Sequence, residues 1–214
     1  MKSREKIIEN LKKEYINQIK EIDENVYRGH ISSLSIVGEN EICLYLKRSL
    51  GNKHKFYIDP TVPKKYSKDK KQTRPDILIT DLSNNLKYAV EIKLNQGWSR
   101  KIDSGYVKKL KNDFKLFKHE GKIDIDYFIF NETQKDYYER GNVEIKTSNN
   151  VRYLYIVLTA ANSKFEYHKY NYETLKKAGI EYYVLFDGWY HQLREIQDKN
   201  YECMSINKLE DSLK

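Results

Sequence analysis

The feature that most constrains the fold of this chain is a pair of apolar, strand-like runs joined by a segment of turn-forming residues. The first run, 77–80, is rich in β-branched residues and begins shortly after a proline, where a missing backbone donor is tolerated. The second run, 88–94, ends in alternating charged and apolar residues. Residues 81–85 between them, Asp-Leu-Ser-Asn-Asn, favour a turn. We therefore expect an antiparallel hairpin over 77–94.

Three charged side chains lie at functionally suggestive places in this predicted hairpin. Asp76 opens the first strand, and alternation along the second strand puts Glu91 and Lys93 on one face. The hairpin would bring Asp76 close to Glu91. Two carboxylates and a lysine on adjacent strands suit the binding of a divalent metal and the cleavage of a phosphodiester. The alternative is a solvent-exposed hairpin with ordinary surface charges.

The pattern Pro75-Asp76 followed by Glu91-x-Lys93, with a glutamate-bearing helix before it and a basic helix after it, resembles the PD-(D/E)XK nuclease superfamily. That superfamily includes type II restriction endonucleases and Holliday-junction resolvases. The resemblance covers roughly residues 33–130. It implies an α/β fold with a restriction-endonuclease-like core, a central mixed β-sheet flanked by helices. The implied core order is helix, three antiparallel strands, helix and a further strand.

The resemblance also implies roles for individual residues and a cofactor. Asp76 and Glu91 match the metal-binding acids, and Lys93 matches the lysine that positions or activates water. The backbone carbonyl of Ile92 would add a third metal ligand. The expected reaction is cleavage that depends on Mg²⁺, for which Mn²⁺ can substitute, and that leaves a 5′ phosphate.

A glutamate from the helix that begins near Gly38 would complete this site, because the first helix of the superfamily often contributes one. We prefer Glu41, which lies three residues after Gly38 and ahead of Leu44 on its own face. Glu39 is the close alternative. An ordinary surface glutamate on an amphipathic helix is an equal interpretation for either residue.

An excess of basic residues favours a nucleic-acid partner. The formal net charge is +8, which favours a polyanion through counterion release. One basic cluster leads into Asp76, and a second lies on a predicted helix with an apolar stripe after Lys93. A solvated lysine-rich surface is the alternative for these clusters. The residues expected to contact DNA are Lys64, Lys65, Lys68, Lys70, Lys71, Arg74, Lys108 and Lys111.

The remaining sequence predicts one domain over 1–214. Residues 4–24 have apolar positions among charges and predict an amphipathic helix packed on or beside the core, not a signal peptide. A dimer contact through this helix is an alternative, and ordinary packing is at least as good an interpretation. Further strands are expected at 125–130, 151–158 and 180–186, with helices at 172–178 and 194–214. No run could span a membrane, and two cysteines in a lysine-rich chain suggest a cytoplasmic protein.

Together these patterns predict a metal-dependent endonuclease acting on DNA, of the type II restriction class. A Holliday-junction resolvase or another repair nuclease is the alternative within that class. A catalytically inactive module that binds nucleic acid with the same fold is an alternative from a different class. A protein-interaction domain whose positive charge serves only solubility is the third.

Overall fold

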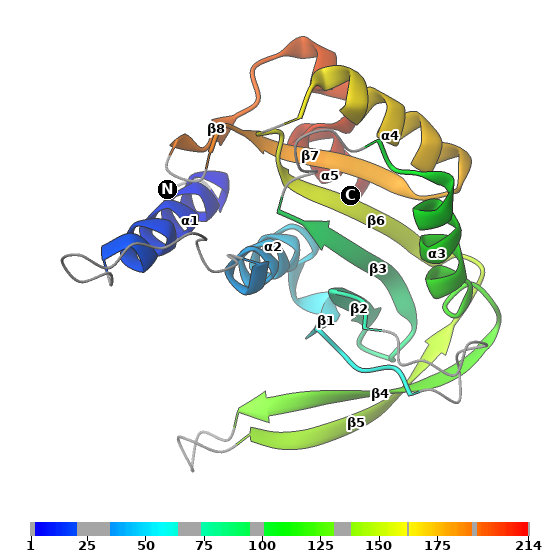
Figure 1. Cartoon of the computed structure of the whole chain (residues 1–214). Coiled ribbons are helices and arrows are strands. Elements are labelled where there is room, and N and C mark those ends of the chain that lie inside the picture. The colour runs from blue at the N-terminus through cyan, green and yellow to red at the C-terminus, as the bar shows by residue number, and fades with distance from the viewer. Residues whose placement is uncertain are drawn as a thin grey trace.

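The computed structural model describes residues 3–20, 35–63, 74–94, 101–130, 138–161, 163–189 and 192–213. It has an α/β fold, in which helices flank a mixed six-stranded sheet and a two-stranded sheet lies beside it (Figure 1). The helices are α1 (Ser3–Lys20), α2 (Ser35–Leu50), η1 (Gly51–Lys53), α3 (Ser104–Lys115), α4 (Phe165–Lys177), η4 (Lys199–Met204) and α5 (Ile206–Leu213). The strands are β1 (His54–Ile58), β2 (Ile77–Asp81), β3 (Leu86–Lys93), β4 (Gly121–Phe130), β5 (Tyr138–Thr147), β6 (Arg152–Thr159), β7 (Glu181–Asp187) and β8 (Arg194–Glu195).

The six-stranded sheet has the order β1-β2-β3-β6-β7-β8. Its first three strands are antiparallel, β3, β6 and β7 run parallel, and β8 is antiparallel to β7. The hairpin predicted at 77–94 is confirmed, with Ile77 opposite Val90. The turn forms because one carboxylate oxygen of Asp81 accepts the backbone N–H groups of Ser83 and Asn85, both at 2.9 Å.

Two hydrophobic clusters cover the two faces of this sheet. One cluster includes residues of α3, α4, η4 and the β4–β5 hairpin, and the other includes residues of α1, α2 and α5. Strand β6 contributes alternate side chains to both clusters, for example Tyr155 to the first and Ile156 to the second. A strand covered on both faces has a nearly continuous apolar sequence, which explains why the run 151–158 predicted a central strand.

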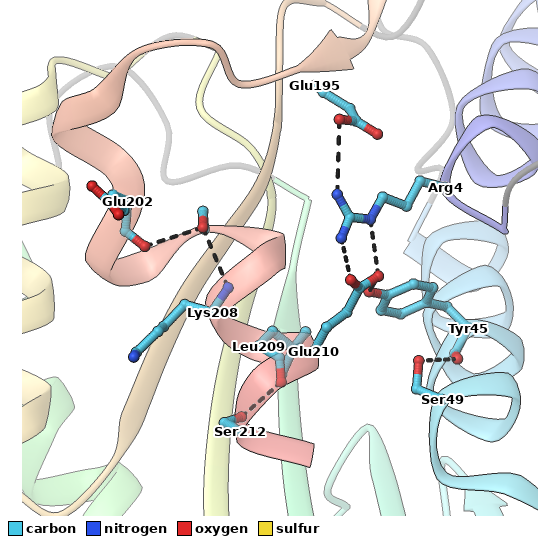
Figure 2. Close-up of polar contacts among 10 residues, drawn as sticks. Arg4, Tyr45, Ser49, Glu195, Glu202, Lys208, Leu209, Glu210 and Ser212 are labelled. Carbon is cyan, nitrogen blue, oxygen red and sulfur yellow. Dashed lines mark hydrogen bonds and ion pairs between the residues drawn. The ribbon is translucent and has the colours of Figure 1, made fainter. Parts of the chain in front are cut away.

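The N-terminal helix is confirmed as α1, and residues 21–24 of the prediction lie outside the described residues. Ile7 and Leu11 are fully buried in the cluster that α1 shares with α2. The α1 helix is also bound to α5: Arg4 is paired with Glu210, and Tyr45 of α2 donates to Glu210 at 2.5 Å (Figure 2). The apolar face of this helix is therefore used for packing within the chain.

Several other boundaries differ from the predictions. The strand expected at 125–130 is the second half of β4, which pairs with β5 and not with the main sheet. The helix expected at 172–178 is the end of α4, and the C-terminal 194–214 contains β8, η4 and α5 instead of one helix. None of the helices in the described part of the chain is long and apolar enough to cross a membrane.

Candidate active site

The β2–β3 hairpin places the two predicted metal ligands side by side. Asp76 immediately precedes β2, and Glu91 lies on β3 one step beyond the pair formed by Ile77 and Val90. Side chains two residues apart on a strand share a face. Leu78 on β2 and Ala89 on β3 both lie in the cluster on the α3 side, and so Asp76 and Glu91 face that side as well.

The carboxylate of Asp76 is half-buried and oriented by the backbone. Its Oδ2 atom accepts the N–H of Ile92 at 2.5 Å. Burial, followed by repulsion from Glu91, raises the pKa of Asp76 to about 7, although the Ile92 N–H and the charge of Lys93 act in the opposite direction. Within the described residues its second oxygen, Oδ1, has no hydrogen-bond partner.

Lys93 lies on the same face of β3 and forms an ion pair with Glu91, with 2.5 Å between Nζ and Oε1. Burial lowers the pKa of Lys93, but attraction to Glu91 and the hydrogen bond with it outweigh burial and raise this pKa above its ordinary value. The sequence prediction that Asp76, Glu91 and Lys93 come together is therefore matched by the geometry.

Tyr106 adds a hydroxyl group to this cluster that no sequence pattern had indicated. It lies in the first turn of α3, where the Asp103 side chain caps the helix by accepting the Tyr106 N–H at 2.7 Å. The Tyr106 hydroxyl lies 3.5 Å from Oε1 of Glu91. Burial, together with the neighbouring Tyr155 and Glu91, raises the pKa of Tyr106.

Glu39, and not Glu41, is the helix glutamate beside the cluster. A Cβ atom at Gly38 would lie only 3.0 Å from the Leu94 side chain, so glycine allows the first turn of α2 to approach the end of β3 closely. Burial, then repulsion from Asp59, raises the pKa of Glu39, while the charge of Lys93 opposes the rise. Glu39 is thus the α2 glutamate whose charge interacts with those of Lys93 and Glu91.

The preference for Glu41 is corrected by its position on the opposite side of α2. Positions two residues apart on a helix point about 200° apart. Glu41 is buried and accepts a hydrogen bond from Nδ2 of Asn10 on α1, at 2.7 Å. Glu41 therefore contributes to the packing of α2 against α1, and Glu39 takes its place in the candidate site.

Asp59 is a second acid near the cluster. It follows β1 with a positive φ of 47°, and its N–H donates to the carbonyl of Asp76 at 2.8 Å. Its side chain is exposed and lines a cavity of about 320 Å³ together with Arg74. Asp59 is a turn acid at the surface, and its place beside the cluster depends on the pairing of β1 with β2.

Of the residues predicted to contact nucleic acid, some lie in the described ranges and others lie outside them. Arg74 is exposed, and Lys108 and Lys111 are exposed on α3, off its buried stripe as expected. Lys111 lines a separate cavity of about 240 Å³ with Phe114. The other predicted residues lie outside the described ranges: Lys64, Lys65, Lys68, Lys70 and Lys71.

The donor atoms fit a hard divalent cation of the Mg²⁺ type. In the described ranges, no group of three or more His, Cys, Asp and Glu side chains is arranged to hold a metal ion. Mg²⁺ sites, however, commonly use one or two carboxylates, with water and substrate phosphate as the other ligands. Asp76 and Glu91, with the backbone carbonyl of Ile92, match that smaller set.

Comparisons with protein-family models, curated proteins and solved structures found no match to this chain. The functional argument therefore depends on the residues and the geometry of the site.

Proposed function

We propose that this protein is a metal-dependent endonuclease that hydrolyses phosphodiester bonds in DNA. The observation that carries the proposal is the convergence of Asp76, Glu91 and Lys93 on one face of two adjacent strands. The order of α2, β1 to β3, α3 and β6 supports it, since the resemblance to PD-(D/E)XK nucleases implies a restriction-endonuclease-like core with that order. A type II restriction role is the extension of this proposal by analogy.

Each residue has a distinct chemical role in the proposed reaction. Asp76 and Glu91 hold the metal, with the Ile92 carbonyl as a third ligand. Bound Mg²⁺ or Mn²⁺ supplies positive charge to the phosphodiester and lowers the pKa of water. Lys93 presents its ammonium group on the same face, where it pairs with a phosphate oxygen or orients the attacking water. Glu39 supplies a further carboxylate from the α2 side.

One observation favours the inactive module that binds nucleic acid. Lys93 already compensates the charge of Glu91, with 2.5 Å between Nζ and Oε1, so the fold can hold this carboxylate without a bound metal ion. In that alternative, the basic surface binds nucleic acid and neither Asp76 nor Glu91 is needed. The two functions differ in whether DNA is cut and whether the cutting requires these acids.

The test is incubation of the purified protein with plasmid, linear duplex and four-way-junction DNA, with and without Mg²⁺ or Mn²⁺. Lys93→Ala is the test variant. Lys87→Ala is a matched control, because Lys87 lies on the same strand and is ion-paired with Asp81 at 3.2 Å, away from the site.

We expect cleavage that needs metal, is lost in Lys93→Ala and is retained in Lys87→Ala. Preference for the junction over the duplexes would reassign the enzyme to the resolvase alternative. If none of these substrates is cut in either metal, the DNA endonuclease proposal fails. If Lys93→Ala cuts at the wild-type rate, Lys93 has no part in the mechanism.

A further inference from the structure

The β4–β5 hairpin lies beside β1, which is the edge strand of the main sheet next to β2. In Figure 1 it runs below β1 and β2. Thr61, just after β1, forms two backbone hydrogen bonds of 2.9 Å with Asp126 on β4. The rings of Tyr57 on β1 and Tyr127 on β4 also pack edge to face, with 5.2 Å between centroids. These contacts fix the position of the hairpin relative to β1.

A cavity of about 320 Å³ lies where the hairpin faces the end of β1. Asp59 and Arg74 line it on the sheet side, and Asp126 and Arg140 line it on the hairpin side. Two arginines thus reach one cavity from segments far apart in the sequence. Arginine presents several N–H donors in a planar arrangement that matches phosphate oxygens.

The guanidinium group of Arg140 has N–H donors that its ion pair with Asp126 does not use. One oxygen of Asp126 pairs with Arg140 at 2.6 Å, and the other accepts from Nδ2 of Asn142 at 2.8 Å. This pairing uses one nitrogen of the guanidinium group, whose side chain is 69% exposed. Arg74 is exposed as well, and in the described residues it has no hydrogen bond or ion pair.

Two of the residues that line the cavity are held next to Asp76 of the candidate site by the backbone. Arg74 precedes Asp76 by two residues, and the N–H of Asp59 is bonded to the carbonyl of Asp76 at 2.8 Å. A polyanion whose phosphate lies at Asp76 would therefore pass close to Arg74.

We propose that this cavity is a phosphate-binding subsite, in which Arg74 and Arg140 hold a backbone phosphate of nucleic acid next to the phosphate at Asp76. The β4–β5 hairpin then forms one wall of the substrate-binding surface. This inference rests on the proposed function, because it takes the strand that reaches the candidate active site as its ligand. Phosphate contacts of this kind position the substrate without reading its sequence.

The test measures the binding of a fluorescent duplex DNA in EDTA, where no cleavage occurs, at several NaCl concentrations. The variants are Arg74→Ala, Arg140→Ala and Arg140→Glu. Arg194→Ala is the matched control, because its side chain is 71% exposed and is paired with Asp187 at 3.1 Å, on a strand outside the cavity. Cleavage in Mg²⁺ is measured separately on the same proteins.

We expect each alanine variant at the cavity to weaken binding by about three- to tenfold and to reduce the salt slope by about one, with a larger loss in Arg140→Glu. Arg194→Ala should bind like the wild type. Equal effects of Arg140→Ala and Arg194→Ala, or no DNA binding by the wild type, would overturn the subsite. Arginine-dependent binding without any cleavage in Mg²⁺ would support the subsite while contradicting the endonuclease proposal. Cleavage in Mg²⁺, together with unchanged DNA binding by the cavity variants, would support the endonuclease proposal while contradicting the subsite.

Discussion

The ammonium group of Lys93 lies 2.5 Å from the carboxylate of Glu91, on the same face of β3. Asp76 faces the same side from the start of β2, and its carboxylate is oriented by the backbone N–H of Ile92. One cation and two carboxylates are thus brought together by strand pairing alone. The arrangement needs no long loop to position it, and this rigidity suits the phosphodiester chemistry that we propose for it.

Glu39 and Glu41 provide a direct comparison of two glutamates on one helix. We expect Glu39→Gln to lower metal-dependent cleavage by about tenfold or more, since it removes a charge beside Lys93. Glu41→Gln should change cleavage less than about threefold, because Glu41 contacts Asn10 and the Gln side chain can still accept that hydrogen bond. The check is the single-turnover cleavage rate of both variants. Equal losses would contradict the assignment of Glu39 to the site.

Arg4 should contribute strongly to stability because it joins three segments. It pairs with Glu210 on α5 and lies 3.8 Å from Glu195 on β8 (Figure 2). We expect Arg4→Ala to lower the free energy of unfolding by about 1–3 kcal/mol, since the partly buried Glu210 loses its cationic partner and keeps only the neutral Tyr45 hydroxyl among the contacts described above. Arg194→Ala removes an exposed pair and should leave the unfolding free energy almost unchanged. Urea denaturation of both variants measures this difference, and equal stabilities would refute the prediction.

His168 should make stability depend on pH. It is fully buried, with Nδ1 2.7 Å from the Tyr182 hydroxyl. Burial lowers its pKa from 6.5 to about 4, although the backbone of Ala160 nearby opposes the shift. Between these two values the unfolded chain binds a proton and the folded protein does not. The contribution of His168 to the free energy of unfolding is therefore highest above pH 6.5. It decreases by up to about 3 kcal/mol as the pH falls from 6.5 towards 4.

The measurement for His168 is the free energy of unfolding at several pH values for the wild type and His168→Gln. The difference in slope between the two proteins isolates this histidine from the acids that titrate in the same range. We expect a flatter curve for the variant below pH 6.5. Parallel curves would show that His168 titrates alike in both states.

Asp103 should stabilise the start of α3, which carries Tyr106 towards Glu91. Its side chain accepts the Tyr106 N–H at 2.7 Å. We expect Asp103→Ala to lower the free energy of unfolding by about 1 kcal/mol, as the loss of a helix cap usually does. Ser104→Ala, at the first helical position, is the control and should have a smaller effect in thermal denaturation. A larger loss in the control would contradict the capping role.

The parts of the fold that local patterns predict are those with strict periodicity. The hairpin at 77–94, the buried stripe of α3 and the doubly covered strand β6 follow from alternation or helical spacing, and each is confirmed. The strand β1 has mostly partly exposed or exposed side chains, and its residues carried no clear signal. Residues 125–130 indicated a strand, but the choice of β5 as partner depends on tertiary contacts.

The candidate site shows the same limit at the level of single residues. Strand alternation places Glu91 and Lys93 together, because it depends only on neighbours in sequence. The choice between Glu39 and Glu41 depends on the rotation of α2 about its axis. That rotation is set by the close approach of Gly38 to Leu94 and by the contact of α2 with Asn10, which no local pattern encodes.

The most direct test of the central claim is the rate of Mg²⁺-dependent cleavage of plasmid DNA by the wild type, Asp76→Asn and Glu91→Gln. Glu144→Gln, an exposed acid paired with Lys122 on the β4–β5 hairpin, is the control. We predict that the wild type and the control cut at similar rates and that both site variants lose at least about a hundredfold, since several kcal/mol of charge stabilisation depend on the metal. Cleavage by Asp76→Asn and Glu91→Gln at the wild-type rate would contradict the account.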